Sequence, residues 1–448
     1  MCETYIQERL AQFGGERRPH YDLGNLKKAL ASLDHPEKQT RCVLVGGTNG
    51  KGSTSLLLSA ALTAHGYRVR TYTSPHLYSP TERFLHNLDP IPAETLLALI
   101  EQHAELAKAH SLSYFEYLTL LFFEWCRQQT TDYAIVEVGL GGALDATNVF
   151  DPLASVLTNV DLDHQEYLGP TREIILQDKI QISREGRTLY TGVSGSLLQA
   201  AEAYASKHGV FIKTPPSFQL RSRGWDGQRL GLENTEVRLA DPSEATAHNA
   251  ALAWEVLRSQ FPEISIPTLQ HAFSSVRFPG RFEVLADSPR TLLCGAHNPH
   301  GLESLRSTLE SLPKTGPLHV VCAFSGDKPY REMFDLLNSI ADKICVTENS
   351  GARNPGPSTW PEGTPMEADL EAALNRYRPD SPEGTLLITG SLYLIGAARK
   401  LLGLPLCFAK DLVPIAQPTV ESPFCSTSGD ASPAKLQASA PAQNPARA

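Results

Sequence analysis

Short runs of Val, Ile and Leu alternate with longer helical patterns along most of this chain. One such run, 42–46 (CVLVG), precedes an apolar helical pattern over 53–65, and another, 69–73, precedes a helix that starts near Pro92 and continues to about His110. Continuous short apolar runs are typical of strands buried on both faces. A repeated strand–helix order therefore predicts an α/β fold, with a mostly parallel sheet covered by helices on both sides.

The same rhythm continues to about residue 402. Strands are expected at 133–138, 154–158, 188–190 and 210–212, with helices at 115–128 and near 197–208. A second α/β series follows, with strands at 292–294, 318–323, 344–347 and 386–389 and helices near 301–312, 330–341, 367–377 and 392–402. Between the two series, residues 216–240 are irregular. Turn candidates at 225–227 and 233–234 indicate a small hairpin insertion there.

The chain length indicates two or three domains, because a typical domain has ~100–200 residues. The second α/β series begins after Pro279-Gly280-Arg281, so we expect a larger domain over 1–282 and a smaller α/β domain over 283–412. Beyond residue 412 the chain is rich in Pro, Ala and Ser and has little to bury. We predict that 413–448 is a disordered tail.

Composition excludes several classes of protein. Forty Lys and Arg against 49 Asp and Glu give a net charge of −9, which argues against a general nucleic-acid binder. The eight cysteines form no C-x-x-C pair, so a disulfide scaffold or a structural zinc site is not expected. The N-terminus lacks a signal-peptide pattern, and no apolar run approaches the ~20 residues of a membrane span. We expect a cytoplasmic protein without membrane or nucleic-acid partners.

A glycine-rich segment, GGTNGKGS at 46–53, separates the first strand from its helix. Backbone N–H groups at a helix N-terminus attract phosphate, and glycines allow close approach. Lys51 would add a charge for the terminal phosphates. The strict Walker pattern fails, because Val45 and Gly52 occupy its first glycine and its Ser/Thr positions. A plain glycine-rich turn with a solvated lysine is the alternative, and the flanking strand and helix favour the phosphate loop.

Glu137 is the only charge near the end of an otherwise apolar strand (YAIVEV). Ligands of α/β sheets gather at the carboxyl ends of strands, and a carboxylate there is costly unless it meets a metal or a cation. We therefore expect Glu137 to converge in space with the loop around Lys51. Taken alone, His164 would be a loop histidine bonded to Asp161 or Asp163, and Lys179 would form a helix-surface ion pair with Asp178 or Glu173.

An ordered series of motifs resembles one family. The loop TNGKGS (48–53) is similar to that of the Mur ligase superfamily. The segments TSPHL (73–77) with ER (82–83), YFEYLT (114–119), EVGLGG (137–142) with LDATN (144–148), DH (163–164), LG (168–169), FPGRFE (278–283), AHNPH (296–300) and TGSLY (389–393) are similar to folylpolyglutamate synthases and dihydrofolate synthases. Because the matches run in order from about 41 to 396, the chain is identified as a member of that family, with its Mur ligase-like fold.

This resemblance implies an ATP- and Mg²⁺-dependent ligase. It would add L-glutamate to dihydropteroate, to folates or to both through an acyl phosphate, as a monomer, with a monovalent cation as a further cofactor. The catalytic residues implied are Lys51, Lys179 and His297. The ATP site implied is Thr48, Asn49, Gly50, Lys51, Gly52, Ser53, Thr54, Asn249, Arg281 and His297. The metal ligands implied are Ser74, Glu137, His164 and Lys179, the last as a carbamate. The pterin or folate pocket implied is Ser113, Phe115, Asp145 and Ala146.

Several of these residues also have simpler interpretations. Asn249 could cap the start of a helix, Phe115 could be core packing, and Arg281 could form a salt bridge at the hinge. The chain also departs from the family pattern, with Ala143 in place of the usual Arg and Cys294 in place of the usual Asp. Two other functions therefore stay open: a Mur-type ligase with a different acceptor, and a nucleotide-binding homologue that has lost ligase activity.

Overall fold

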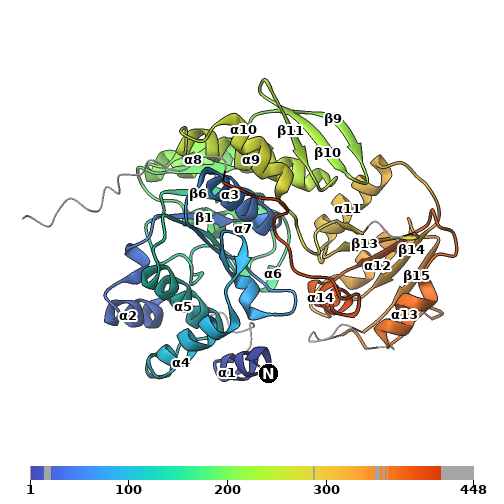
Figure 1. Cartoon of the computed structure of the whole chain (residues 1–448), viewed down its shortest axis with the longest axis horizontal. Coiled ribbons are helices and arrows are strands. Elements are labelled where there is room, and N and C mark those ends of the chain that lie inside the picture. Colours follow the sequence, from blue (N-terminus) through green and yellow to red (C-terminus); the bar gives the residue numbers. More distant parts are fainter. Residues whose placement is uncertain are drawn as a thin grey trace, which may run out of the picture.

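A large sheet of mostly parallel strands forms the first half of the molecule (Figure 1). In this computed structural model the described residues are 2–14, 22–285, 288–348, 354–356, 359–360 and 362–414. The strand order is β4-β3-β2-β5-β1-β6-β7-β8. Six strands are parallel: β2 (Val69–Tyr72), β5 (Tyr133–Glu137), β1 (Cys42–Gly46), β6 (Ala154–Leu157), β7 (Thr188–Thr191) and β8 (Phe211–Lys213). The short strands β3 (Phe84–His86) and β4 (Asp89–Pro90) add an antiparallel edge.

Helices cover both faces of this sheet, as the strand–helix alternation predicts. Because side chains alternate along a strand, Val43 and Val45 of β1 enter one core and Cys42 and Leu44 enter the other. The first core is covered by α3 (Lys51–His65), α9 (Glu244–Gln260) and α10 (Ile266–Ser275). The second is covered by α1 (Cys2–Ala11), α2 (Gly24–Ser32), α4 (Ala93–Ala109) and α5 (Tyr114–Gln128). Near β6 and β7 lie α7 (Arg172–Lys179) and α8 (Gly195–His208).

The expected hairpin insertion at 216–240 is wrong in extent. Residues there form a three-stranded antiparallel sheet of β9 (Phe218–Gly224), β10 (Gly227–Leu232) and β11 (Thr235–Leu239). Both predicted turns separate these strands. A third strand is added because Val237 and Leu239 bury alternate side chains in the core beneath α9 and α10.

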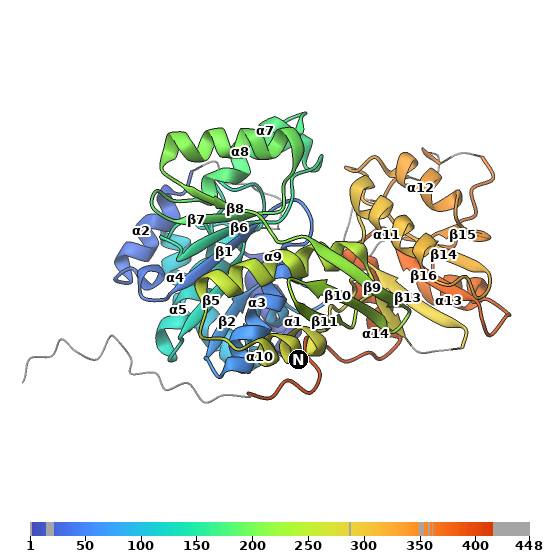
Figure 2. The same ribbon diagram turned by 90° about the horizontal axis from the view of Figure 1, so that it is seen from above.

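A second sheet forms the other half of the molecule (Figure 2). Its order is β12-β13-β16-β14-β15. Its strands are β12 (Glu283–Leu285), β13 (Arg290–Cys294), β14 (Leu318–Cys322), β15 (Lys343–Val346) and β16 (Thr385–Thr389). Only β12 pairs antiparallel. Its helices are α11 (Pro299–Ser311), α12 (Tyr330–Asn338), α13 (Leu370–Tyr377) and α14 (Leu392–Leu401). The predicted elements of this half all occur, with ends displaced by at most three residues.

The end of the chain is described only in part. The predicted tail over 413–448 lies, from residue 415 onward, outside the described residues. Among the helices that are described, none combines the length and the apolar character needed to cross a membrane.

Candidate active site

A cleft of about 1390 Å³ lies between the two halves of the molecule. Its lining comes from the carboxyl ends of β1, β5 and β6, from the start of α9, and from loops of the second sheet. Parallel sheets collect ligands at this end of their strands. Every residue of the predicted catalytic, nucleotide, metal and acceptor sites except Thr54 lines this cleft.

The loop after β1 is held by the end of β6. The amides of Thr48 and Asn49 donate to Asn159 O and Oδ1 at 3.0 and 2.9 Å, and Thr158 Oγ1 donates to Asn49 O at 2.6 Å. Gly47 is obligatory here, because its φ is 141° and a methyl group on it would lie 1.9 Å from Thr158 Oγ1. Gly50, at φ 82°, starts α3, so this helix begins at Lys51 rather than at the predicted Ser53.

Lys51 and Glu137 converge on this loop. Lys51 Nζ donates to Thr48 O at 3.1 Å. Burial lowers the pKa of Lys51, although the negative charges of Glu137 and Asp163 act to raise it. Glu137 ends β5 with only 3% of its surface exposed. Its Oε2 accepts the Ser74 amide at 3.1 Å and would lie 3.4 Å from a methyl group on Gly52. Burial raises the pKa of Glu137, and the charge of Lys51 counteracts that rise.

Lys179, the last residue of α7, reaches the same loop. It is 4% exposed, and its Nζ donates to Gly47 O at 3.1 Å. Lys51 Nζ approaches that carbonyl at 3.3 Å. Burial, and then the charge of Lys51, lower the pKa of Lys179 to about 7. The alternative of a helix-surface ion pair with Asp178 or Glu173 is therefore wrong, because this amine is not at the surface.

The predicted acceptor residues lie at the start of α5 and in the loop after β5. Ser113 caps α5 and bonds Glu116 Oε2 at 2.7 Å, so its hydroxyl is already engaged. The ring of Phe115 would lie 2.5 Å from a methyl group on Gly139, which brings it against the glycine-rich loop. Asp145 accepts the amides of Leu140 and Thr147 at 2.9 and 3.0 Å, and burial raises its pKa. Ala146 is buried beside it.

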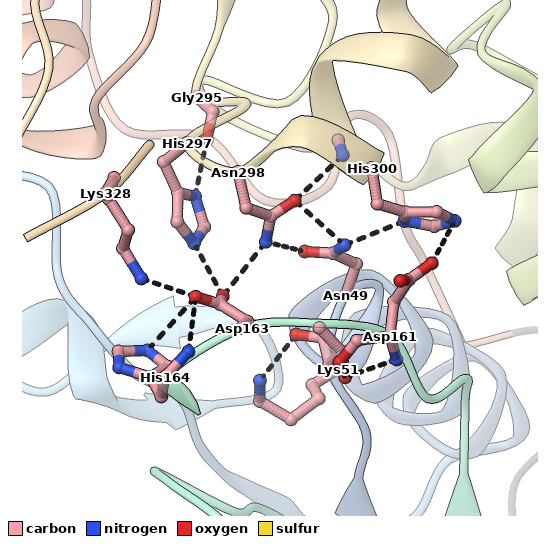
Figure 3. Close-up of polar contacts among 12 residues, drawn as sticks. Asn49, Lys51, Asp161, Asp163, His164, Gly295, His297, Asn298, His300 and Lys328 are labelled. Carbon is pink, nitrogen blue, oxygen red and sulfur yellow. Dashed lines mark hydrogen bonds and ion pairs between the residues drawn. The ribbon is translucent and has the colours of Figure 1, made fainter. Parts of the chain in front are cut away.

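Residues of the second half reach across the cleft (Figure 3). Asn298, which caps α11, exchanges amide hydrogen bonds with Asn49 of the glycine loop at 3.1 and 3.3 Å. Its Nδ2 also donates to Asp163 Oδ2 at 3.0 Å, and Lys328 forms an ion pair with the same carboxylate. Burial alone would raise the pKa of Asp163, but His164 and Lys328 hold it well below its usual range.

The remaining predicted residues surround this junction. His297 bonds Gly295 O at 2.9 Å through Nδ1, and its Nε2 lies 4.0 Å from Asp163 Oδ2. His164 lies with Nε2 4.0 Å from Asp163 Oδ1, and burial lowers its pKa to about 4. Arg281 lines the cleft beside the second sheet.

Asn249 lies within α9 rather than at its start. Its Oδ1 would be 2.4 Å from a methyl group on Gly50. The helix-cap alternative for Asn249 is wrong, because Ser243 caps α9.

Sequence reasoning missed the roles of Asp161, Asp163, His300 and Lys328 as contacts between the halves. The available signal was two carboxylates just after the strand at 154–158, the same end-of-strand position that singled out Glu137. His300 Nε2 lies 3.6 Å from Asp161 Oδ2, and its Nδ1 lies 3.0 Å from Asn49 Nδ2.

Among the described residues, no three His, Cys, Asp or Glu side chains are grouped as a metal site. The predicted ligand set contains only two side chains of these four kinds, Glu137 and His164. Magnesium rarely needs such a cage, because it keeps several waters and is bound through one or two carboxylates and substrate phosphates. Glu137 fits that role, since it is a buried carboxylate for which the structure gives one hydrogen bond, from the Ser74 amide, beside the phosphate loop.

Comparisons with known proteins define the class first. The family description "Mur ligase middle domain" matches residues 45–193, and "Mur ligase, glutamate ligase domain" matches 280–392. The solved structure "E.coli FolC in complex with DHPP and ADP" superposes with a TM-score of 0.80 at 28% identity, covering 90% of this chain and 97% of that one. A Mycobacterium tuberculosis folylpolyglutamate synthase bound to ADP and AMPPCP also gives 0.80, at 27% identity, covering 91% and 99%. The chain therefore has the fold of the Mur ligases.

Curated relatives identify the family of this chain within the Mur ligase fold. The folylpolyglutamate synthase of Lacticaseibacillus casei is 30% identical over 418 residues, which are 88% of this chain and 96% of the relative. The dihydrofolate synthase/folylpolyglutamate synthase of Escherichia coli is 31% identical over 380 residues, covering 80% and 86%. This chain belongs to the folylpolyglutamate synthase and dihydrofolate synthase family.

Proposed function

We propose that the chain is an ATP- and Mg²⁺-dependent ligase that joins L-glutamate to dihydropteroate, to folates, or to both. The observation that carries this proposal is the convergence of Lys51, Lys179 and Glu137 on one glycine loop. Two amines and a carboxylate at a phosphate loop suit phosphoryl transfer, which depends mainly on positioning and on charge stabilisation. The names of the relatives, and the folate and nucleotide complexes of their structures, support the same assignment.

In this proposal the loop and the head of α3 bind the triphosphate of ATP. Backbone amides from Thr48 to Thr54 and the Lys51 ammonium would neutralise its oxygens. Asn249 lies beside Gly50 and is assigned to the adenine side. Arg281, at the junction of the two halves, and His297, of the second half, would complete the nucleotide site.

Glu137, Ser74 and His164 would hold Mg²⁺, which when bound neutralises charge on the phosphates. Glu137 is the main ligand in this assignment, because a buried carboxylate gains most from a cation. Histidine is a less usual magnesium ligand, so His164 is assigned a minor share.

Lys179 is assigned as a carbamate. That reaction requires a neutral amine, which adds to CO₂ and loses a proton, and burial supplies a lysine of lowered pKa. The product would place a negative group beside Lys51 in place of a buried ammonium.

The reaction then has two steps. The acceptor carboxylate, placed beside the loop by Phe115, Asp145 and Ala146, attacks the γ-phosphorus and releases ADP. The amine of glutamate attacks the resulting acyl phosphate, loses a proton, and phosphate leaves. Lys51 would stabilise charge in the first step, and the second half of the molecule would present glutamate across the cleft.

The domain boundary, the oligomeric state, the cellular location and a monovalent cation are proposed as well. Dividing the chain at residue 282 assigns the eight-stranded and three-stranded sheets to the first domain and the five-stranded sheet to the second. A monomer is proposed on the family resemblance alone. The described cysteines are all free, which favours the cytoplasm. A monovalent cation remains part of the proposal without a residue assigned to it.

One assay tests the function. Purified protein with ATP, Mg²⁺ and labelled glutamate would receive dihydropteroate, a reduced folate or a muramyl acceptor in parallel. We expect label in the dihydropteroate tube, the folate tube or both. Label in the muramyl tube alone would favour a different Mur-type ligase. ATP binding without transfer to any acceptor would favour a homologue that has lost activity.

A further inference from the structure

Apolar side chains on the acceptor side of the cleft are open to solvent. Leu144 is 49% exposed and Tyr167 is 43% exposed, and both line the cleft together with Leu140 and Leu168. We call these four residues the acceptor wall. Large apolar side chains that line a binding cleft and face solvent mark a surface that a ligand covers.

The acceptor wall continues from the predicted pterin pocket. Phe115 lies against Gly139, one residue before Leu140. A methyl group on Gly141 would lie 3.1 Å from Leu168 Cδ2, so the loop and α6 (Gln165–Leu168) touch. A methyl group on Gly142 would lie 2.7 Å from the Lys179 Cα. The acceptor wall therefore begins beside the pocket of Phe115 and ends beside the lysine at the phosphate loop.

The charges along this stretch all have one sign. Cleft-lining residues from Gly139 to Asp178 include four acids and no Lys or Arg; Asp163 is paired with Lys328 of the second half, which leaves Asp145, Glu166 and Asp178. The Oδ2 atom of Asp178 is buried, has no hydrogen-bond partner within the described part of the chain, and would lie 2.6 Å from a methyl group on Gly141. A free carboxylate of a ligand placed here would meet negative charge.

The other cations of the cleft are committed elsewhere. Lys51 and Lys179 contact the phosphate loop. Arg83 donates Nε to His76 at 2.8 Å, and its charge acts on Glu137. The remaining two described cations of the lining are Arg281, just before β12 at the junction of the two halves, and Lys328 of the second half. The acceptor wall thus offers contact area for rings and no cation for extra carboxylates.

The candidate acceptors differ in this respect. Dihydropteroate has one carboxylate, which is the reacting group, and its body is a bicyclic dihydropterin joined to a benzene ring. A folate that already carries glutamate reacts through a side-chain carboxylate and keeps a free α-carboxylate between its rings and the reaction centre. We infer that the acceptor wall binds the ring body of a monocarboxylate acceptor, so that this chain prefers dihydropteroate to glutamylated folates. This inference rests on the proposed function.

Acceptor binding can be tested without turnover. The full chain, with Mg²⁺ and a non-hydrolysable ATP analogue, would be titrated with dihydropteroate, tetrahydrofolate and its triglutamate. We expect dihydropteroate to bind about tenfold more tightly than tetrahydrofolate, and the triglutamate to bind more weakly again. Equal or tighter binding of the glutamylated acceptors would overturn the inference. The same preference without glutamate transfer would support the acceptor wall while contradicting the proposed function.

Two leucines give a matched pair of variants. Leu144→Arg adds a cation to the acceptor wall. Leu220→Arg makes the same change at a leucine of similar exposure, 47%, on β9 and outside the cleft lining. We expect Leu144→Arg to shift the ratio of affinities about tenfold toward glutamylated folate, and Leu220→Arg to leave it unchanged. A ratio unchanged in both variants, with both folded by circular dichroism, would contradict the inference.

Discussion

The two sides of the cleft carry charge in different ways. On the side of the first sheet, Glu137 and Lys179 are almost completely buried and contact the backbone of their own half. On the side of the second sheet, His297 and His300 keep about a third or more of their side-chain surface exposed and meet the first half through polar contacts. The first side is therefore organised before substrate arrives, whereas the second depends on how the halves approach each other.

The largest expected effect comes from Glu137, on the side of the first sheet. Glu137→Ala should lower turnover by about 10³-fold, because the metal-bound phosphates lose their main anchor. The fold should survive, because burying a carboxylate costs desolvation free energy that alanine does not incur. Steady-state kinetics and thermal unfolding would check both statements. Glu137→Gln is the control of equal shape, and turnover near the wild-type value in either variant would contradict the metal assignment.

The buried lysine gives the next effect. With the pKa of Lys179 at about 7 when folded and near 10.4 when unfolded, the unfolded chain binds more protons between these values. Stability should therefore rise with pH across that window in CO₂-free buffer. Lys179→Met should remove this rise and be more stable than the wild type near pH 7, by up to about 4 kcal/mol.

Denaturant unfolding at several pH values measures this difference, with Lys207→Met as an exposed control. Parallel pH profiles of the wild type and Lys179→Met would refute the buried amine. A separate observation, a mass increase of wild-type protein incubated with CO₂, would support the carbamate.

A smaller effect is expected across the cleft. Asn49→Ala and Asn298→Ser each break the amide pair, and serine keeps the cap of α11. The effects of the two changes on kcat/KM for glutamate should be non-additive. Expressed as a free energy, the double variant should differ from the sum of the single variants by about 0.5–3 kcal/mol. Full additivity in the double variant would mean that this contact does not couple the two halves.

Sequence reasoning found the groups that a single element reveals. Glu137 is identified by one charge at the end of an apolar strand, and Lys51 by its place between a strand and a helix. Periodicity likewise predicted the parallel strands, since most of them are buried on both faces; β8 is an exception, with Phe211 63% exposed.

The remaining features depend on distant contacts. Asn49 and Asn298 are 249 positions apart, and Lys179 meets Gly47 across 132. No local pattern reports such distances. The third strand of the insertion was missed for a related reason, because β11 is stabilised by packing beneath α9 and α10 rather than by its own alternation alone.

Transfer of an isotope tests the central claim, an acyl phosphate formed at the loop of Lys51 and Glu137. The acceptor would carry ¹⁸O in its carboxylate, and the phosphate released during ligation with glutamate would be analysed by mass spectrometry. An acyl phosphate requires one acceptor oxygen to leave with each phosphate, so we predict one ¹⁸O per phosphate. Phosphate without ¹⁸O, formed together with the glutamylated product, would contradict this mechanism.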